Sequence, residues 1–157
     1  MTEVVKDHMA TGYQWEATVY LELWMEIEKR YGRDVARDIC TNAMYDAGVR
    51  FGKRMAKDAG KNDLASLKEV WESLYPMGDD TEWDGKRLAF HNQACIIKST
   101  LSMYNLPEDL YREIAMVFCD GDRGFVNGFN PDIRFTWGKR IFREEPECVW
   151  IMEAPEA

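Results

Sequence analysis

The last third of the 157-residue chain holds the side chains best suited to chemistry. Cys119 and Asp122 are three residues apart, so they share one face if a helix continues through them. A second thiol, Cys148, comes after the turn-forming segment 130–132, which reads Asn-Pro-Asp. Thiols and carboxylates that converge across a helix and a sheet are able to open a small electrophilic ring.

The carboxylate of Asp122 does not by itself activate Cys119, because a nearby negative charge repels the thiolate and raises the thiol pKa. If Cys119 is the nucleophile, Asp122 therefore receives a proton or holds the substrate. Formation of the thiolate then needs a cation, for which Arg123, Arg134 and a protonated His91 are the candidates. The alternative is that Cys119 is a small apolar side chain on the buried stripe of its helix, as free cysteine often is.

His91 is a candidate general base, since the near-neutral pKa of an imidazole allows proton exchange at physiological pH. Alternation along its strand puts it on the face opposite Leu88 and Phe90, where a solvent-facing histidine is the competing interpretation. Asn130 and Asp132 also have two interpretations. They form the entry turn of a strand, or they place an amide and a carboxylate at the rim of a pocket.

Composition excludes several classes of protein and partner. The length of 157 residues predicts one domain over residues 1–157, and the hydrophobic share of 46% predicts that it is folded. Residues 1–12 are expected to be a mobile N-terminal tail. The net charge of −8 argues against nucleic acid as a partner. No apolar run approaches the ~18 residues that span a bilayer, so we expect no membrane contact. The N-terminus is too polar for a signal peptide.

The cysteines predict no disulfide framework, and the histidines are too few for a His-rich zinc site, although a mixed set of Cys, His and Asp ligands stays open. Cys40, Cys95, Cys119 and Cys148 lie far apart, which is typical of reduced thiols in a cytoplasmic protein. The chain has only two histidines and lacks His-Glu-x-x-His, the phosphate-binding Gly-x-x-x-x-Gly-Lys-Ser/Thr and the dinucleotide-binding Gly-x-Gly-x-x-Gly. It also lacks the Gly-x-Ser-x-Gly of a nucleophile elbow. We expect no metal and no cofactor.

Apolar periodicity predicts three helices in the first half, over residues 15–31, 34–58 and 64–75. The buried face of the first helix is expected to carry Tyr20, Trp24, Ile27 and Tyr31. The buried stripe of the second is expected to carry Val35, Ile39, Ala43, Ala47, Phe51 and Met55. The small residues Ala43, Ala47 and Gly48 would let another helix approach closely, which also suggests a homodimer.

The second half predicts two pairs of strands separated by one helix. Asp84-Gly85 is a strong two-residue hairpin signal between apolar segments. The expected elements are strands at 81–83 and 87–90, the latter continued through His91 to Ile97; a helix from Leu106 that frays between Gly121 and Gly128; and strands at 133–137 and 148–152, joined by a turn at 143–146. The order ααα-ββ-α-ββ predicts an α+β fold, with a helical N-terminal half packed on one face of a small antiparallel sheet.

Three segments near the C-terminus resemble the L-2-amino-thiazoline-4-carboxylic acid hydrolase family. They are Phe118-Cys119-x-x-Asp122, the run from Gly128 to Phe135, and Glu147-Cys148 before the final strand. The helices that precede these segments agree with the family in kind. One feature departs from it: a Gly-Asp pair usually precedes the late cysteine, where this chain has residues 144–147, Glu-Glu-Pro-Glu.

The resemblance implies a hydrolase that opens a small cyclic amidine or thiazoline carboxylate to a carbamoyl amino acid. Either Cys119 attacks the amidine carbon, or water does so with Asp122 or His91 as the base. Asn130 or a backbone N–H would stabilise charge at the attacked carbon, and Arg134 would pair with the substrate carboxylate. The remaining predicted substrate contacts are Asp132, Trp137, Cys148 and Trp150.

A function of another class is a non-catalytic domain that binds or senses a small molecule. Its pocket would be lined by the aromatic side chains Phe135, Trp137 and Trp150. Cys119 and Cys148 would then form pocket wall or a thiol switch. The two functions predict different outcomes for Cys119→Ser, which would abolish turnover in a thiol enzyme and leave ligand binding almost unchanged.

Overall fold

The computed structural model describes residues 3–74, 80–93 and 95–155. In chain order its elements are α1 (Glu3–Tyr31), α2 (Arg33–Ala59), α3 (Leu64–Leu74), β1 (Asp80–Trp83), β2 (Arg87–Asn92), α4 (Ile96–Leu101), η1 (Ser102–Tyr104), α5 (Glu108–Phe118), α6 (Asp120–Phe129), β3 (Arg134–Lys139), η2 (Ile141–Arg143) and β4 (Cys148–Glu153). The strands form one antiparallel sheet in the order β1-β2-β4-β3. The predicted α+β fold is confirmed. Tyr75, the last residue of the predicted third helix, lies outside the described residues.

The hairpin between β1 and β2 forms where the sequence predicts it. Gly85 has a φ of +91°, which glycine adopts without a steric penalty. The Asp84 carboxylate accepts hydrogen bonds from the backbone N–H groups of Lys86 and Arg87, at 2.8 and 2.7 Å. Local hydrogen bonds thus set the turn, and the turn sets the register of the two strands.

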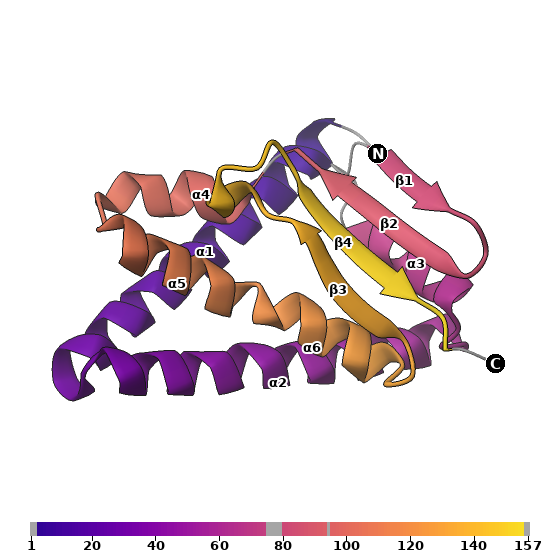
Figure 1. Cartoon of the computed structure of the whole chain (residues 1–157), viewed down its shortest axis with the longest axis horizontal. Coiled ribbons are helices and arrows are strands. Elements are labelled where there is room, and N and C mark those ends of the chain that lie inside the picture. The colour runs from indigo at the N-terminus through magenta and orange to yellow at the C-terminus, as the bar shows by residue number, and fades with distance from the viewer. Residues whose placement is uncertain (1–2, 75–79, 94, 156–157) are drawn as a thin grey trace.

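The sheet packs one face on helices (Figure 1). Cys148, Trp150 and Met152 of β4 lie opposite Asn92, Phe90 and Leu88 of β2 and are buried with them on that face. Trp71 of α3 contacts this layer, with its ring centroid 6.0 Å from that of Trp150. A second core cluster joins α1, α2, α4, α5 and η2; its largest buried side chains are Trp24, Tyr20 and Phe142.

The predicted face of α1 is confirmed except at its end. Tyr20 and Trp24 are buried and Ile27 packs against the same core cluster. Tyr31 is 65% exposed, because the chain turns into α2 directly after it and none of the described elements covers it. The backbone is already helical from Glu3, within the segment expected to be a tail.

The predicted buried stripe of α2 is wrong. Val35, Ile39 and Phe51 are 41%, 47% and 42% exposed, and Ala43 and Ala47 are exposed as well. Of the predicted stripe, Met55 packs against the core. The buried residues of the helix are Ala36, Cys40 and Gly52. Contact between helices overrides the apolar pattern here, because the partner helix approaches the face with the smallest side chains.

That partner is α6, which runs beside α2 (Figure 1). A Cβ atom on Gly48 would lie 2.1 Å from the Gly121 carbonyl oxygen, and one on Gly52 would lie 2.0 Å from the Phe125 carbonyl oxygen. Gly124 and Gly128 face α2 in the same way. The prediction that the helix frays between Gly121 and Gly128 is therefore wrong, since these glycines form a contact surface. The close approach that Gly48 permits is therefore made by α6, a helix of the same chain.

The strand β2 ends at Asn92, so its predicted extension to Ile97 is also wrong. Cys95 ends the extended segment as the N-cap of α4, and its sulfur accepts a hydrogen bond from the Lys98 N–H at 3.3 Å. A side-chain acceptor at this position satisfies one of the free N–H groups of a helix start.

Candidate functional site

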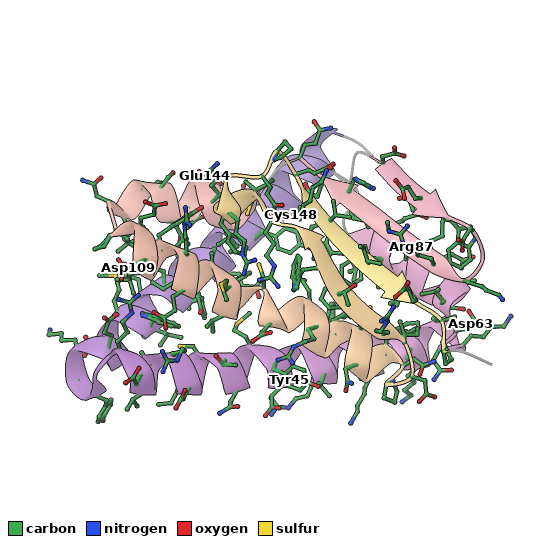
Figure 2. The ribbon with its side chains drawn as sticks, in the orientation of Figure 1. Tyr45, Asp63, Arg87, Asp109, Glu144 and Cys148 are labelled. Carbon is green, nitrogen blue, oxygen red and sulfur yellow. The ribbon has the colours of Figure 1, made fainter. Side chains whose placement is uncertain are left out.

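Three thiols converge beside the end of the sheet where β4 begins. Cys148 is the first residue of β4 and lies opposite Asn92, the last residue of β2, so Cys95 follows close by. The Cys148 thiol donates a hydrogen bond to the Cys95 sulfur. Figure 2 labels Cys148 at this end of the sheet and Arg87 toward the hairpin end. Cys119 interacts electrostatically with Cys95 from the junction of α5 and α6.

The surroundings of Cys95 favour its thiolate. The pKa of its thiol is lowered to about 7, first because the Cys148 thiol donates to it and then because the Lys98 and Ile97 backbone N–H groups do. Burial and the Asp122 carboxylate act in the opposite direction. The same contact, together with burial, raises the pKa of the donor Cys148.

Cys119 is held as a neutral thiol. Burial raises its pKa, and the negative charges of Asp122 and Cys95 raise it further. The guanidinium of Arg140 opposes this shift without reversing it. Arg123, a cation proposed for this role, instead pairs with Asp120 at 3.1 Å.

Alkylation by iodoacetamide between pH 5 and 9 should therefore modify Cys95 first. Because the pKa of Cys95 is about 7, its rate should reach half its plateau near pH 7, while Cys119 and Cys148 should still be accelerating at pH 9. Peptide mass spectrometry assigns each rate to a cysteine. Buried Cys40, whose pKa burial also raises, serves as the internal slow reference. A half-point for Cys95 above pH 8.5 would contradict the described hydrogen bonds.

A hydrogen bond from the sheet holds Asp122 near the thiols. The indole N–H of Trp150 donates to the Asp122 carboxylate at 3.1 Å, and the neighbouring Trp137 ring lies 5.6 Å from that of Trp150. Trp150 is buried, so its hydrogen bond orients the carboxylate in a partly dry environment. The structure thus brings together five of the residues that the sequence singled out: Cys119, Asp122, Trp137, Cys148 and Trp150.

Three other predicted site residues lie elsewhere. Asn130 and Asp132 follow the far end of α6, a helix of ten residues and therefore about 15 Å long. The Asn130 side chain donates to the Asn62 carbonyl and accepts from the Asp132 N–H, both at 2.9 Å, so it fastens a turn. Arg134 pairs with Glu153 at the end of β4 opposite Cys148.

His91 lies on the other face of the sheet. Since side chains alternate along a strand, its face is opposite that of its neighbour Asn92, which shares the helix-covered face with Cys148. The imidazole Nδ1 is 3.0 Å from a Glu147 oxygen and Nε2 is 3.4 Å from a Glu82 oxygen. Hydrogen bonds from Lys139 and then His91 lower the pKa of the Glu147 carboxyl. His91 therefore belongs to a charged cluster separate from the thiols.

Cys95, Arg140 and Tyr111 are site residues that sequence reasoning missed. Cys95 was expected inside a strand, and no local pattern marks it as a helix cap beside a second thiol. Tyr111 borders a cleft of about 380 Å³, which is also lined by Lys98, Leu101, Ile141 and Phe142. Burial and the electrostatic influence of the three thiols raise the pKa of Tyr111 to about 12. Tyr111 therefore borders the cleft and lies within electrostatic range of the thiols.

Comparison with protein families identifies a match over residues 12–151, most of the chain, to L-2-amino-thiazoline-4-carboxylic acid hydrolase. A search among curated proteins found no match. No helix in the described part of the chain is both long and apolar enough to cross a membrane. The match extends the resemblance seen near the C-terminus through the helical half. The chain belongs to the L-2-amino-thiazoline-4-carboxylic acid hydrolase family.

Proposed function

We propose that this protein hydrolyses a small thiazoline-type ring that carries a carboxylate, at the site formed by Cys95, Cys119, Cys148 and Asp122. The observation that carries the proposal is the convergence of three thiols and a carboxylate from three separate segments of the chain. The family match supports the substrate class, because the family is named for a hydrolase of such a ring.

The electrophile in such a ring is the amidine carbon, which is bonded to the ring sulfur and to two nitrogens. Cys95 is the best nucleophile of the three thiols, since a pKa of about 7 leaves much of it as thiolate at neutral pH. Cys119, which the sequence suggested for this role, keeps its proton and lines the site as a neutral thiol. Cys148 holds the Cys95 thiolate by its hydrogen bond.

In the proposed reaction, the Cys95 thiolate forms a bond to the amidine carbon. The bond from that carbon to the ring sulfur breaks, and the sulfur leaves with the electron pair as a thiolate. Water then adds to the carbon while Asp122 accepts one of its protons and passes it to the released sulfur, and the bond to Cys95 breaks to restore the Cys95 thiolate. The two protons of the water finish on the ring nitrogen and the released thiol, giving a carbamoyl amino acid.

The test is incubation with L-2-amino-2-thiazoline-4-carboxylate. Turnover should release one new thiol per molecule, detected colorimetrically, and a product heavier by one water molecule in mass spectrometry. Calorimetry shows whether the compound binds. Binding without any ring opening would favour the alternative function, a domain that binds or senses a small molecule.

A further inference from the structure

We infer that Arg140 is the residue that binds the carboxylate of the substrate, a specificity determinant of the proposed ring-opening reaction. The inference rests on the proposed function and names the group that selects an acidic ring over a neutral one. Arg140 follows β3 directly and is the N-cap of η2; because Lys139 before it pairs with Val149, Arg140 lies at the end of the sheet where β4 begins.

The first support is the lack of a charge partner for Arg140. Nine of the chain's arginines pair with a carboxylate in the described part of the structure: Arg30, Arg33, Arg37, Arg50, Arg54, Arg87, Arg112, Arg123 and Arg134. Among the described residues, no carboxylate pairs with the Arg140 guanidinium or with that of Arg143. Arg143 is exposed, so water solvates its charge, whereas Arg140 is half-buried.

The second support is the way the Arg140 side chain is held. Its guanidinium carbon lies 4.4 Å from the centroid of the Trp137 ring and 5.6 Å from that of Phe142. Stacking on aromatic rings fixes the plane of a guanidinium and leaves its edges available for hydrogen bonds. The nearby Glu145 carboxylate accepts a hydrogen bond from the Arg140 backbone N–H at 2.5 Å, and in the described part of the structure it forms no ion pair with the guanidinium.

The third support is position. The next residue, Ile141, donates its backbone N–H to the Cys148 sulfur at 3.3 Å, and the charge of Arg140 interacts with Cys119, Asp120 and Cys148, so Arg140 lies beside the thiol cluster. Asp120 is already paired with Arg123. A partly desolvated cation that lacks an anion carries an uncompensated desolvation cost, which a bound anion offsets. A carboxylate matches the guanidinium edge with two parallel hydrogen bonds, and this geometry would present the rest of a small ring to the thiols.

The assignment also explains how a protein with a net charge of −8 would accept an acidic substrate. A local cation among low-dielectric aromatic walls attracts an anion more strongly than the distant surface charges repel it, because those charges are screened by water and salt.

Calorimetry with two inert rings tests the assignment without requiring turnover. The probes are L-2-oxothiazolidine-4-carboxylate and thiazolidin-2-one, the same ring without its carboxylate. The wild-type protein should bind the acid more tightly than the neutral ring. Arg140→Gln should weaken binding of the acid by about 100-fold and leave the affinity for the neutral ring unchanged. Arg140→Lys should lose less, because it keeps the charge without the paired hydrogen bonds. Arg143→Gln is the matched control and should bind both rings like the wild type.

The assignment is overturned if the wild type shows no preference for the acid, if Arg140→Gln binds the acid as the wild type does, or if Arg134→Gln rather than Arg140→Gln loses the preference. Thermal unfolding of each variant separates a binding defect from a folding defect. Preference for the acid without any ring opening would reject the proposed reaction and keep the anion site. Equal kcat/KM values for amino-thiazolines with and without the carboxylate would reject the site and keep the reaction.

Discussion

Cys95→Ser is expected to lower kcat for ring opening by about 10³-fold or more, because a serine hydroxyl stays protonated at neutral pH and is a far weaker nucleophile than a thiolate. The near-isosteric change should leave KM and folding close to wild type. Steady-state kinetics with L-2-amino-2-thiazoline-4-carboxylate measures the loss. Cys40→Ser is the matched control, since Cys40 is buried on α2 and is not one of the three thiols of the site.

A second measurement asks whether the lost group is the nucleophile. Acid quenching during turnover should trap the opened substrate on Cys95 in the wild type, visible as a mass adduct on its peptide. Cys148→Ala should move the ascending limb of the pH–rate profile upward from about pH 7, because it removes the hydrogen bond that does most to lower the pKa of Cys95. An adduct on Cys119 would instead restore the nucleophile suggested by the sequence, and full activity in Cys95→Ser would leave water activated by Asp122 as the attacking group.

Gly52→Ala is expected to cost about 3 kcal/mol or more in the free energy of unfolding. The new Cβ would lie 2.0 Å from the Phe125 carbonyl oxygen and 2.8 Å from the Phe129 backbone nitrogen, so α2 and α6 must move apart. Backbone atoms cannot yield as a flexible side chain does, and the separation would disturb packing over the whole contact. The higher helix propensity of alanine returns at most about 1 kcal/mol. Urea denaturation should show a lower midpoint with an unchanged slope.

Gly12→Ala provides the control for this experiment. Gly12 is also helical, but nothing lies within 4 Å of the position of a new Cβ, so alanine there should be neutral or stabilising by up to about 1 kcal/mol. Equal midpoints for Gly52→Ala and wild type would mean that the backbones of α2 and α6 are farther apart than described. Because α6 carries Asp122 and starts next to Cys119, loosening this contact should also reduce activity.

The sequence predicted the features that depend on neighbouring residues. Asp84 and Gly85 form their hairpin with hydrogen bonds inside the turn, so the β1–β2 pair followed from local chemistry. Strand alternation correctly placed Leu88 and Phe90 opposite His91, because the period of two is a property of the extended backbone. The motifs around Cys119, Asp122 and Cys148 led to the family, which the match over residues 12–151 confirms.

Tertiary structure decided which candidates share a site. Glycine is ambiguous along a sequence: Gly121 to Gly128 were interpreted as a helix break, and only the close approach of α2 makes them a helix surface. The same contact determines which face of α2 is buried. The face with small residues is covered because α6 packs against it, although another face of α2 is more apolar. Charge pairing depends on atoms from distant segments. Arg134 is therefore paired with Glu153, while Arg140 has no paired carboxylate among the described residues and interacts with the thiols Cys119 and Cys148.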